Sequence, residues 1–268
     1  MDSSSHDNMS FLEHLEELRW HVIRSLIAII SAGFICFLMK DFIFDTIIFG
    51  PKKMDFPTYK FLCQAATFIG VETNFCGDEF PFVVQNRTMA GQFSAHVMTS
   101  VISGFILSFP YVLYEFWKFI SPGLLEKEKA KSRGFIFISS ILFFVGVLFG
   151  YYVISPLSIN FLGTYQVSTQ VLNEIDLGSF ISLVRSSALA SGIIFELPII
   201  IYFLTKAGVV TPESLVKYRK YALVLVLILA AIITPPDVAS QIIVAIPIVV
   251  LYQVSIFISR IVVKNQNK

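Results

Sequence analysis

Six long runs of apolar residues, separated by short polar segments, dominate the pattern of this sequence. Each of the first four has 20 residues or more, the length that a helix needs to cross a hydrocarbon layer of about 30 Å. The fifth has only 14 residues, or about 21 Å of helix. The pattern predicts an all-α membrane protein with six transmembrane helices, of which helices five and six are short. The runs are residues 20–39, 93–117, 135–154, 180–204, 221–234 and 238–258.

The composition supports this assignment to the membrane. Hydrophobic residues make up 55% of the chain and charged residues 15%, whereas a soluble domain has about 25% charged residues. The mean hydropathy is +0.74. A net charge of +1 argues against nucleic acid as a partner. We expect no cleavable signal peptide, since a basic region and a small-residue cleavage site are missing before the first run.

Lys and Arg residues are concentrated in alternate connections. The segments 1–24, 118–133, 206–220 and 260–268 carry fourteen of them, and the segments 40–92 and 156–180 carry five. Positive charge is retained on the cytoplasmic side, so both termini are predicted to be cytoplasmic. We expect one membrane domain over residues 1–268. Its parts outside the spans are a cytoplasmic interfacial helix at 1–19, a long periplasmic loop at 41–92, and cytoplasmic loops at 118–133 and 206–220.

The segment before the first run predicts an amphipathic helix. Ser10 and Glu13 have the spacing of a capping box. Glu13 and Glu17 lie one turn apart, and like charges at this spacing cost about 0.2–0.5 kcal/mol. These acids suit a cationic partner, although a solvated turn at the interface is an equal alternative. The apolar stripe of this helix is Phe11, Leu15, Leu18 and Val22.

The long loop and the fourth run contain two further candidates. Cys63 and Cys76 lie in the loop, where an oxidising compartment favours a disulfide; two buried thiols are the alternative. Glu196 lies inside the fourth run, where an ionisable side chain marks a function or a buried partner. Pro198 frees a backbone carbonyl one turn earlier, and a hydrogen bond to this carbonyl is the structural alternative for Glu196.

Enzymatic signatures are missing from the sequence. It has no nucleotide-binding loop, no H-E-x-x-H motif and no G-x-S-x-G motif. Its four histidines lack metal-ligand spacing except for His14 and His21, seven apart, which we interpret as interfacial helix residues rather than ligands. We therefore expect no enzyme, no cofactor and no metal. A secondary transporter is disfavoured because no internal repeat is found. An intramembrane enzyme is disfavoured as well, because it would need a nucleophile–base pair or metal ligands in the spans, and the sequence shows none there.

Four motifs together resemble the TatC family, the core subunit of the twin-arginine protein translocase. They occur in the family's order and agree with six spans. The motifs are His14-Leu-Glu-Glu-Leu-Arg19, the run from Pro110 to Pro122 with Leu124 and Glu128, Phe195-Glu-Leu-Pro198, and Thr234-Pro-Pro-Asp237 with Gln241 and Ala245-Ile-Pro247.

The resemblance implies a receptor for twin-arginine signal peptides that exports folded proteins across the bacterial inner membrane, driven by the proton-motive force. It implies single-span partner subunits of the TatA or TatB type in a larger complex. Glu17 and Glu128 match the acids of the signal-peptide site. Both also lie just inside the cytoplasmic interface in the predicted topology, where paired carboxylates suit paired guanidinium groups. The other residues carried over are Arg19, Phe119 and Pro122 at that site, and Pro51, Pro110, Glu196, Asp237 and Gln241 elsewhere.

Overall fold

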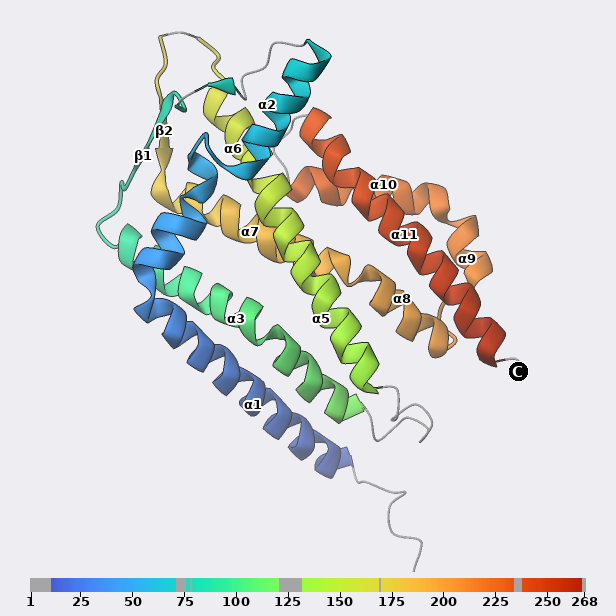
Figure 1. Cartoon of the computed structure of the whole chain (residues 1–268). Helices are drawn as coiled ribbons and strands as arrows, with labels where there is room; N and C mark the ends of the chain where they lie inside the picture. Colours follow the sequence, from blue (N-terminus) through green and yellow to red (C-terminus); the bar gives the residue numbers. More distant parts are fainter. Residues whose placement is uncertain are drawn as a thin grey trace, which may run out of the picture. The chain divides into compact units, whose positions relative to one another are not determined.

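Helices make up most of the chain in its computed structural model (Figure 1). The residues that the structure describes are 11–70, 76–77, 79–120, 132–168, 170–233 and 238–266. The chain divides into two compact units, which are described separately. Unit 1 consists of Met1–Met39 and Val97–Ile141, and unit 2 of Lys40–His96 and Leu142–Lys268.

The elements follow the apolar runs and also fill the long loop. The α-helices are α1 Phe11–Leu38, α2 Pro57–Ile69, α3 Gly91–Ile120, α5 Ser132–Phe149, α6 Ser155–Thr164, α7 Leu177–Phe195, α8 Leu197–Lys206, α9 Pro212–Lys217, α10 Arg219–Ile233 and α11 Val238–Gln266. Short helices of other types are η1 Phe42–Ile48, η2 Gly50–Lys52 and η5 Gly150–Ile154, and the strands are β1 Phe82–Gln85 and β2 Asn173–Asp176.

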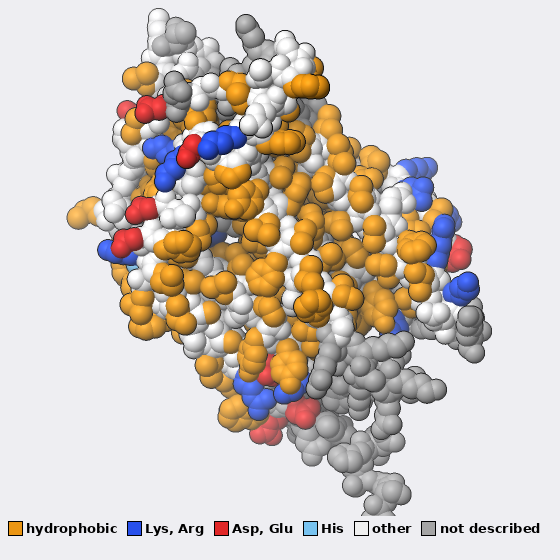
Figure 2. All heavy atoms as spheres, viewed as in Figure 1, with side chains coloured by type: hydrophobic (Ala, Val, Ile, Leu, Met, Phe, Trp, Pro, Cys, Tyr) orange, Lys and Arg blue, Asp and Glu red, His pale blue; other side chains and the backbone are white. Residues whose placement is uncertain are grey.

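Five helical segments are long and apolar enough to cross a membrane. Their side chains leave much apolar surface uncovered, and Figure 2 shows hydrophobic side chains over most of the face in view. Such exposure suits contact with lipid rather than with water. The 15 residues of α10 form a further apolar helix of about 22 Å. The five segments are Leu15–Leu38, Gly91–Phe119, Gly134–Thr164, Leu177–Lys206 and Gln241–Asn265.

The prediction of an all-α fold is wrong in one detail. Strands β1 and β2 pair in parallel, with Phe82 opposite Asn173 and Gln85 opposite Asp176. Both strands lie in connections between the long helices, where backbone groups lack helical partners and pairing satisfies them. Each strand has only four residues, too few for an alternating pattern to stand out in the sequence.

Two helices are longer than expected. The last helix, α11, has 29 residues, so the prediction of a short sixth helix is wrong. This helix continues beyond the apolar run through Arg260 and Lys264, because both residue types have good helix propensity. The segment preceding the first run is likewise continuous with it in α1, and Ser10 of the predicted cap lies outside the described residues.

In unit 1, α1 and α3 touch through two glycines. A Cβ atom on Gly104 would lie 2.4 Å from the backbone nitrogen of Gly33 and 2.6 Å from its Cα atom. A Cβ on Gly33 would lie 3.2 Å from the carbonyl oxygen of Ser100. Small residues allow membrane helices to approach this closely. The contact therefore depends on the absence of a side chain at position 104.

We predict that Gly104→Ala lowers the free energy of unfolding by about 1–3 kcal/mol, because the new methyl group pushes two backbones apart. Gly134→Ala is the matched control, since nothing lies within 4 Å of its Cβ position. That change should be neutral or stabilising by about 0.5–1 kcal/mol. Thermal unfolding of both variants in detergent measures the difference, and equal stability of the two would contradict the contact.

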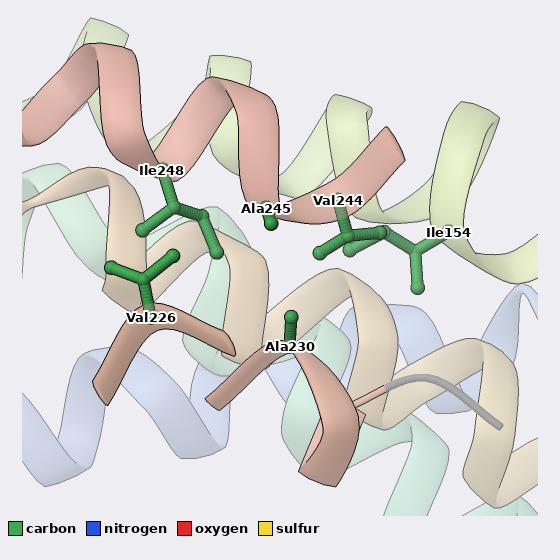
Figure 3. Close-up of a cluster of buried hydrophobic side chains, with 6 residues drawn as sticks. All are labelled: Ile154, Val226, Ala230, Val244, Ala245 and Ile248. Atoms are coloured by element: carbon green, nitrogen blue, oxygen red, sulfur yellow. The ribbon is translucent and has the colours of Figure 1, made fainter. Parts of the chain in front are cut away.

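Unit 2 has its apolar core where α10 and α11 meet the end of η5. Figure 3 shows Val226 and Ala230 of α10 facing the side chains of α11, with Ile154 beside them. Small residues again bring helices together: a Cβ on Gly150 would lie 2.3 Å from the carbonyl oxygen of Ser187 on α7. The α11 residues of the cluster are Val244, Ala245 and Ile248.

In unit 2, the segment between α1 and α3 is ordered around one tyrosine. Tyr59 is fully buried, and its hydroxyl lies 2.9 Å from the carbonyl oxygen of Pro51 and 3.0 Å from that of Pro156. The single hydroxyl hydrogen is thus shared between two carbonyl acceptors. Burial raises the pKa of Tyr59 above its usual range, so the hydroxyl stays protonated and keeps donating. This bond ties η2 and α2 to the start of α6.

A disulfide joins Cys63 of α2 to Cys76, and Cys36 remains a buried free thiol. The sequence separation of 13 corresponds to a stabilisation of about 3 kcal/mol by loop closure. We predict that unfolding without reductant exposes one alkylatable thiol, from Cys36, and that unfolding with reductant exposes three. Mass spectrometry of alkylated peptides checks this. Three alkylated thiols in the unreduced, unfolded protein would show that the disulfide does not form.

Candidate functional site

A buried carboxylate joins α1 to the last turns of α3 in unit 1. Nδ1 of His21 lies 2.6 Å from Oε2 of Glu115, and Nη1 of Arg24 lies 3.7 Å from the same oxygen. Only 2% of Glu115 is exposed. An ionised carboxylate at such a position is costly unless it is paired. The two basic side chains of α1 therefore account for the burial of Glu115.

The same contact determines which face of α1 carries Glu17. Positions 17, 21 and 24 are related as i, i+4 and i+7, so their side chains lie on one side of the helix. Because His21 and Arg24 contact Glu115, Glu17 lies on this side, one turn closer to the N-terminus. Glu17 is half-buried and lines a shallow surface hollow together with Glu16, Trp20, His21 and Arg24, all of α1.

Phe119 is the second predicted residue that the structure places beside this cluster. It follows Glu115 by one helical turn on α3. Its ring centroid lies 6.3 Å from that of His21, in an edge-on arrangement. The half-buried ring of Phe119 thus provides an apolar surface next to the paired charges.

Arg19 lies away from this face. It is two positions from Glu17, about 200° around the helix, and its side chain is exposed. Its Cζ atom lies 5.9 Å from the centroid of the Trp20 ring, within the range of a cation–π contact. The structure therefore does not bring Arg19 and Glu17 together.

Three predicted site residues, Pro122, Glu128 and Asp237, lie outside the described residues. The joint site of Glu17 and Glu128 therefore stays a prediction. Pro110 lies inside α3, in the same helix as Phe119 and about two turns before it. It belongs to the helix that carries Glu115, not to the cluster itself.

The remaining predicted residues lie in unit 2. Glu196 forms the break between α7 and α8, with Pro198 at the start of the second helix. Only 8% of Glu196 is exposed, and its backbone oxygen accepts a hydrogen bond from the nitrogen of Ile199 at 2.9 Å. Gln241 donates from Nε2 to the carbonyl oxygen of Leu227 at 3.1 Å. Pro51 is buried beneath the Tyr59 hydroxyl.

Sequence reasoning missed the roles of His21, Arg24, Glu115 and Tyr59. A signal for Glu115 was available, because it is an ionisable residue inside the second apolar run. Basic residues three positions apart on the first helix were the matching signal. Nothing in the sequence alone pairs them, since 94 residues separate His21 from Glu115.

Among the described residues, no group of three or more potential ligands could hold a metal ion.

The long apolar helices and their uncovered surfaces define a multi-pass helical membrane protein, and comparisons with known proteins specify its family. A family model described as Sec-independent protein translocase protein (TatC) matches residues 13–247. A TatC protein of Blattabacterium sp. subsp. Periplaneta americana is 46% identical over 261 residues, covering 97% of this chain and 98% of that protein. The TatC protein of Aquifex aeolicus is 34% identical over 263 residues, covering 97% and 98%.

Solved structures agree with this assignment. A crystal structure titled twin arginine translocase receptor TatC superposes with a TM-score of 0.69 at 31% identity, covering 94% of this chain and 100% of that one. A second, in the detergent DDM, gives 0.70 at 34% identity, covering 91% and 98%. This chain belongs to the TatC family of Sec-independent protein translocase proteins. It is a membrane component of a translocase, not an enzyme.

We predict that Glu115→Ala lowers the free energy of unfolding by about 1.5–3 kcal/mol, the contribution of hydrogen bonds to a charged group. The change also leaves His21 and Arg24 without the carboxylate that both contact. Glu16→Ala is the control, since this acid is exposed and makes no ion pair with α3 within the described residues. It should change stability by no more than about 0.5 kcal/mol. Thermal unfolding measures both. A Glu115→Ala protein as stable as the control would contradict the role of the cluster.

Proposed function

We propose that this protein is the receptor for twin-arginine signal peptides and the core of a translocase that exports folded proteins across the bacterial cytoplasmic membrane. The proton-motive force supplies the drive. The observation that carries the proposal is the shared face of Glu17, His21 and Arg24 on α1, held by the buried Glu115. Two acids line the hollow beside this cluster, and Glu17 is the half-buried one, on the same helix face as His21 and Arg24.

The chemistry of the cluster suits arginine. Glu115 already has two partners, His21 and Arg24, whereas Glu17 is half-buried at a surface hollow. A carboxylate there accepts two parallel bonds from a guanidinium group, which lysine cannot supply because it lacks the planar fork. Glu128 supplies the second carboxylate of the proposed site. Phe119 offers its ring to the apolar part of the peptide.

The proposed topology has six spans with both termini in the cytoplasm. The short helix α10 is the fifth crossing, and at about 22 Å it is accommodated by local thinning of the bilayer or by snorkelling of its flanking residues. The excess of Lys and Arg in the connections assigned to the cytoplasm supports this orientation. The proposed partners are single-span subunits of the TatA or TatB type, in a larger complex.

We predict that Glu17→Ala and Glu128→Ala each weaken crosslinking to a twin-arginine signal peptide about tenfold or more. A charge-assisted bond contributes about 1.5–3 kcal/mol when it is partly desolvated, and about 1.4 kcal/mol corresponds to tenfold in affinity. The double variant should be non-additive if both acids contact one motif. Photo-crosslinking of the assembled complex measures this.

Glu213→Ala is the control for this experiment, because Glu213 is an exposed acid on α9, on the same side in the proposed topology. Its crosslinking should equal that of the wild type. Wild-type crosslinking in the double variant Glu17→Ala/Glu128→Ala would refute the proposed site and make both acids solvated surface residues.

For Glu196 we propose a role in transport as a neutral hydrogen-bonding group at the break between α7 and α8. Burial at 8% exposure disfavours the charged form of a carboxyl. Glu196→Gln keeps a neutral side chain of similar size and should transport like the wild type. Glu196→Ala removes the hydrogen-bonding group and should impair transport. Export of a folded reporter measures both, and normal export by Glu196→Ala would leave this residue a structural role only.

A further inference from the structure

A small hollow lies between α9 and the last turns of α11 in unit 2. Two hydrogen bonds near it hold the elements together. The Tyr252 hydroxyl donates to the carbonyl oxygen of Leu215 at 2.8 Å, and Nη2 of Arg219 donates to Oε1 of Gln253 at 3.0 Å. The short helix α9 is fixed at its start by reciprocal bonds between Thr211 and Ser214. The hollow is therefore part of the folded unit.

Basic side chains dominate the lining of this hollow. Lys217 of α9 and Arg260 and Lys264 of α11 line it, against one acid, Glu213. Arg260 and Lys264 are one turn apart on α11, so they share a face. Within the described part of the chain, neither makes an ion pair or a hydrogen bond. Figure 2 shows Lys and Arg side chains gathered at the right of the view, where Figure 1 places α9 and the end of α11.

The other wall of the hollow is apolar. It is formed by Val216, which is 40% exposed, and by the half-buried Val263. Tyr218 and Tyr221 follow directly, and both are more than half exposed. Exposed tyrosines are typical of the boundary between lipid and water. The hollow also adjoins the end of the candidate span Gln241–Asn265. Its position is therefore the level of lipid headgroups.

We propose that this hollow binds the headgroup of an anionic phospholipid. The three cations face the phosphate, and the two valines contact the upper part of the acyl chains. Basic pockets between membrane helices bind anionic headgroups in this way. A free phosphate ion would use the cations but gain nothing from the apolar wall. Glu213 opposes the ligand's charge, so its removal should strengthen binding.

Native mass spectrometry of the full chain in a zwitterionic detergent, titrated with phosphatidylglycerol, tests the proposal. Wild-type protein should retain this lipid in preference to phosphatidylcholine. Each of Lys217→Gln, Arg260→Gln and Lys264→Gln should weaken retention about fivefold, since a basic residue near an anionic lipid contributes about 1 kcal/mol. Glu213→Gln should strengthen it. Lys217→Arg with Lys264→Arg keeps the charges and should bind like the wild type.

A control variant with Lys40, Lys53 and Lys60 changed to Gln removes the same charge from residues 40–60, which do not line the hollow. It should retain the lipid normally. The matching variant of the hollow combines Lys217→Gln, Arg260→Gln and Lys264→Gln and should lose the lipid. Equal loss in the two triple variants would show that only total charge matters, and would overturn the proposal. Equal retention of phosphatidylcholine, or full displacement of the lipid by millimolar inorganic phosphate, would overturn it as well.

Discussion

The pairing of the buried Glu115 carboxylate with His21 and Arg24 is the interaction on which the proposed receptor surface depends. Glu115 is only 2% exposed. Without these partners, burying its carboxylate near the end of α3 would cost too much free energy. Because both partners come from one face of α1, the pair determines how this helix is rotated against α3. The rotation decides that Glu17 faces the hollow and that Arg19 faces away from it.

Close packing of small residues makes this ionic contact possible. Gly33 and Gly104 let α1 and α3 approach until a single methyl group would collide with a backbone. At a larger separation, the 2.6 Å contact between His21 and Glu115 would be lost. The glycine contact and the ion pair lie in the same unit and on the same two helices. Each therefore supports the other, and we expect their energies to be coupled.

The fold was largely predictable from the sequence, because long apolar runs leave the chain few alternatives in a membrane. The five long helices and the short α10 coincide with the predicted runs. The strands β1 and β2 were missed because four residues are too few to carry a pattern. The length of α11 was underestimated because a charged helix end such as Arg260 and Lys264 continues a helix without being apolar.

The site was predictable only in part. Motif resemblance identified Glu17 and Phe119, which the structure places on facing sides of one cluster. It gave no role to Glu115 or His21, since a pairing across 94 residues depends on how two helices pack. Such packing is decided by tertiary contacts and not by local pattern. Glu128 was identified from the sequence but lies beyond the described residues, so its part in the site depends on experiment.

The most direct test is the affinity of the purified protein for signal peptides carrying Arg-Arg or Lys-Lys, measured for the wild type and for Glu17→Gln. The wild type should prefer Arg-Arg by about tenfold or more, because only guanidinium groups form bidentate bonds with the carboxylates. Glu17→Gln removes one carboxylate and should reduce this preference at least severalfold. An undiminished preference for Arg-Arg in Glu17→Gln would contradict the account.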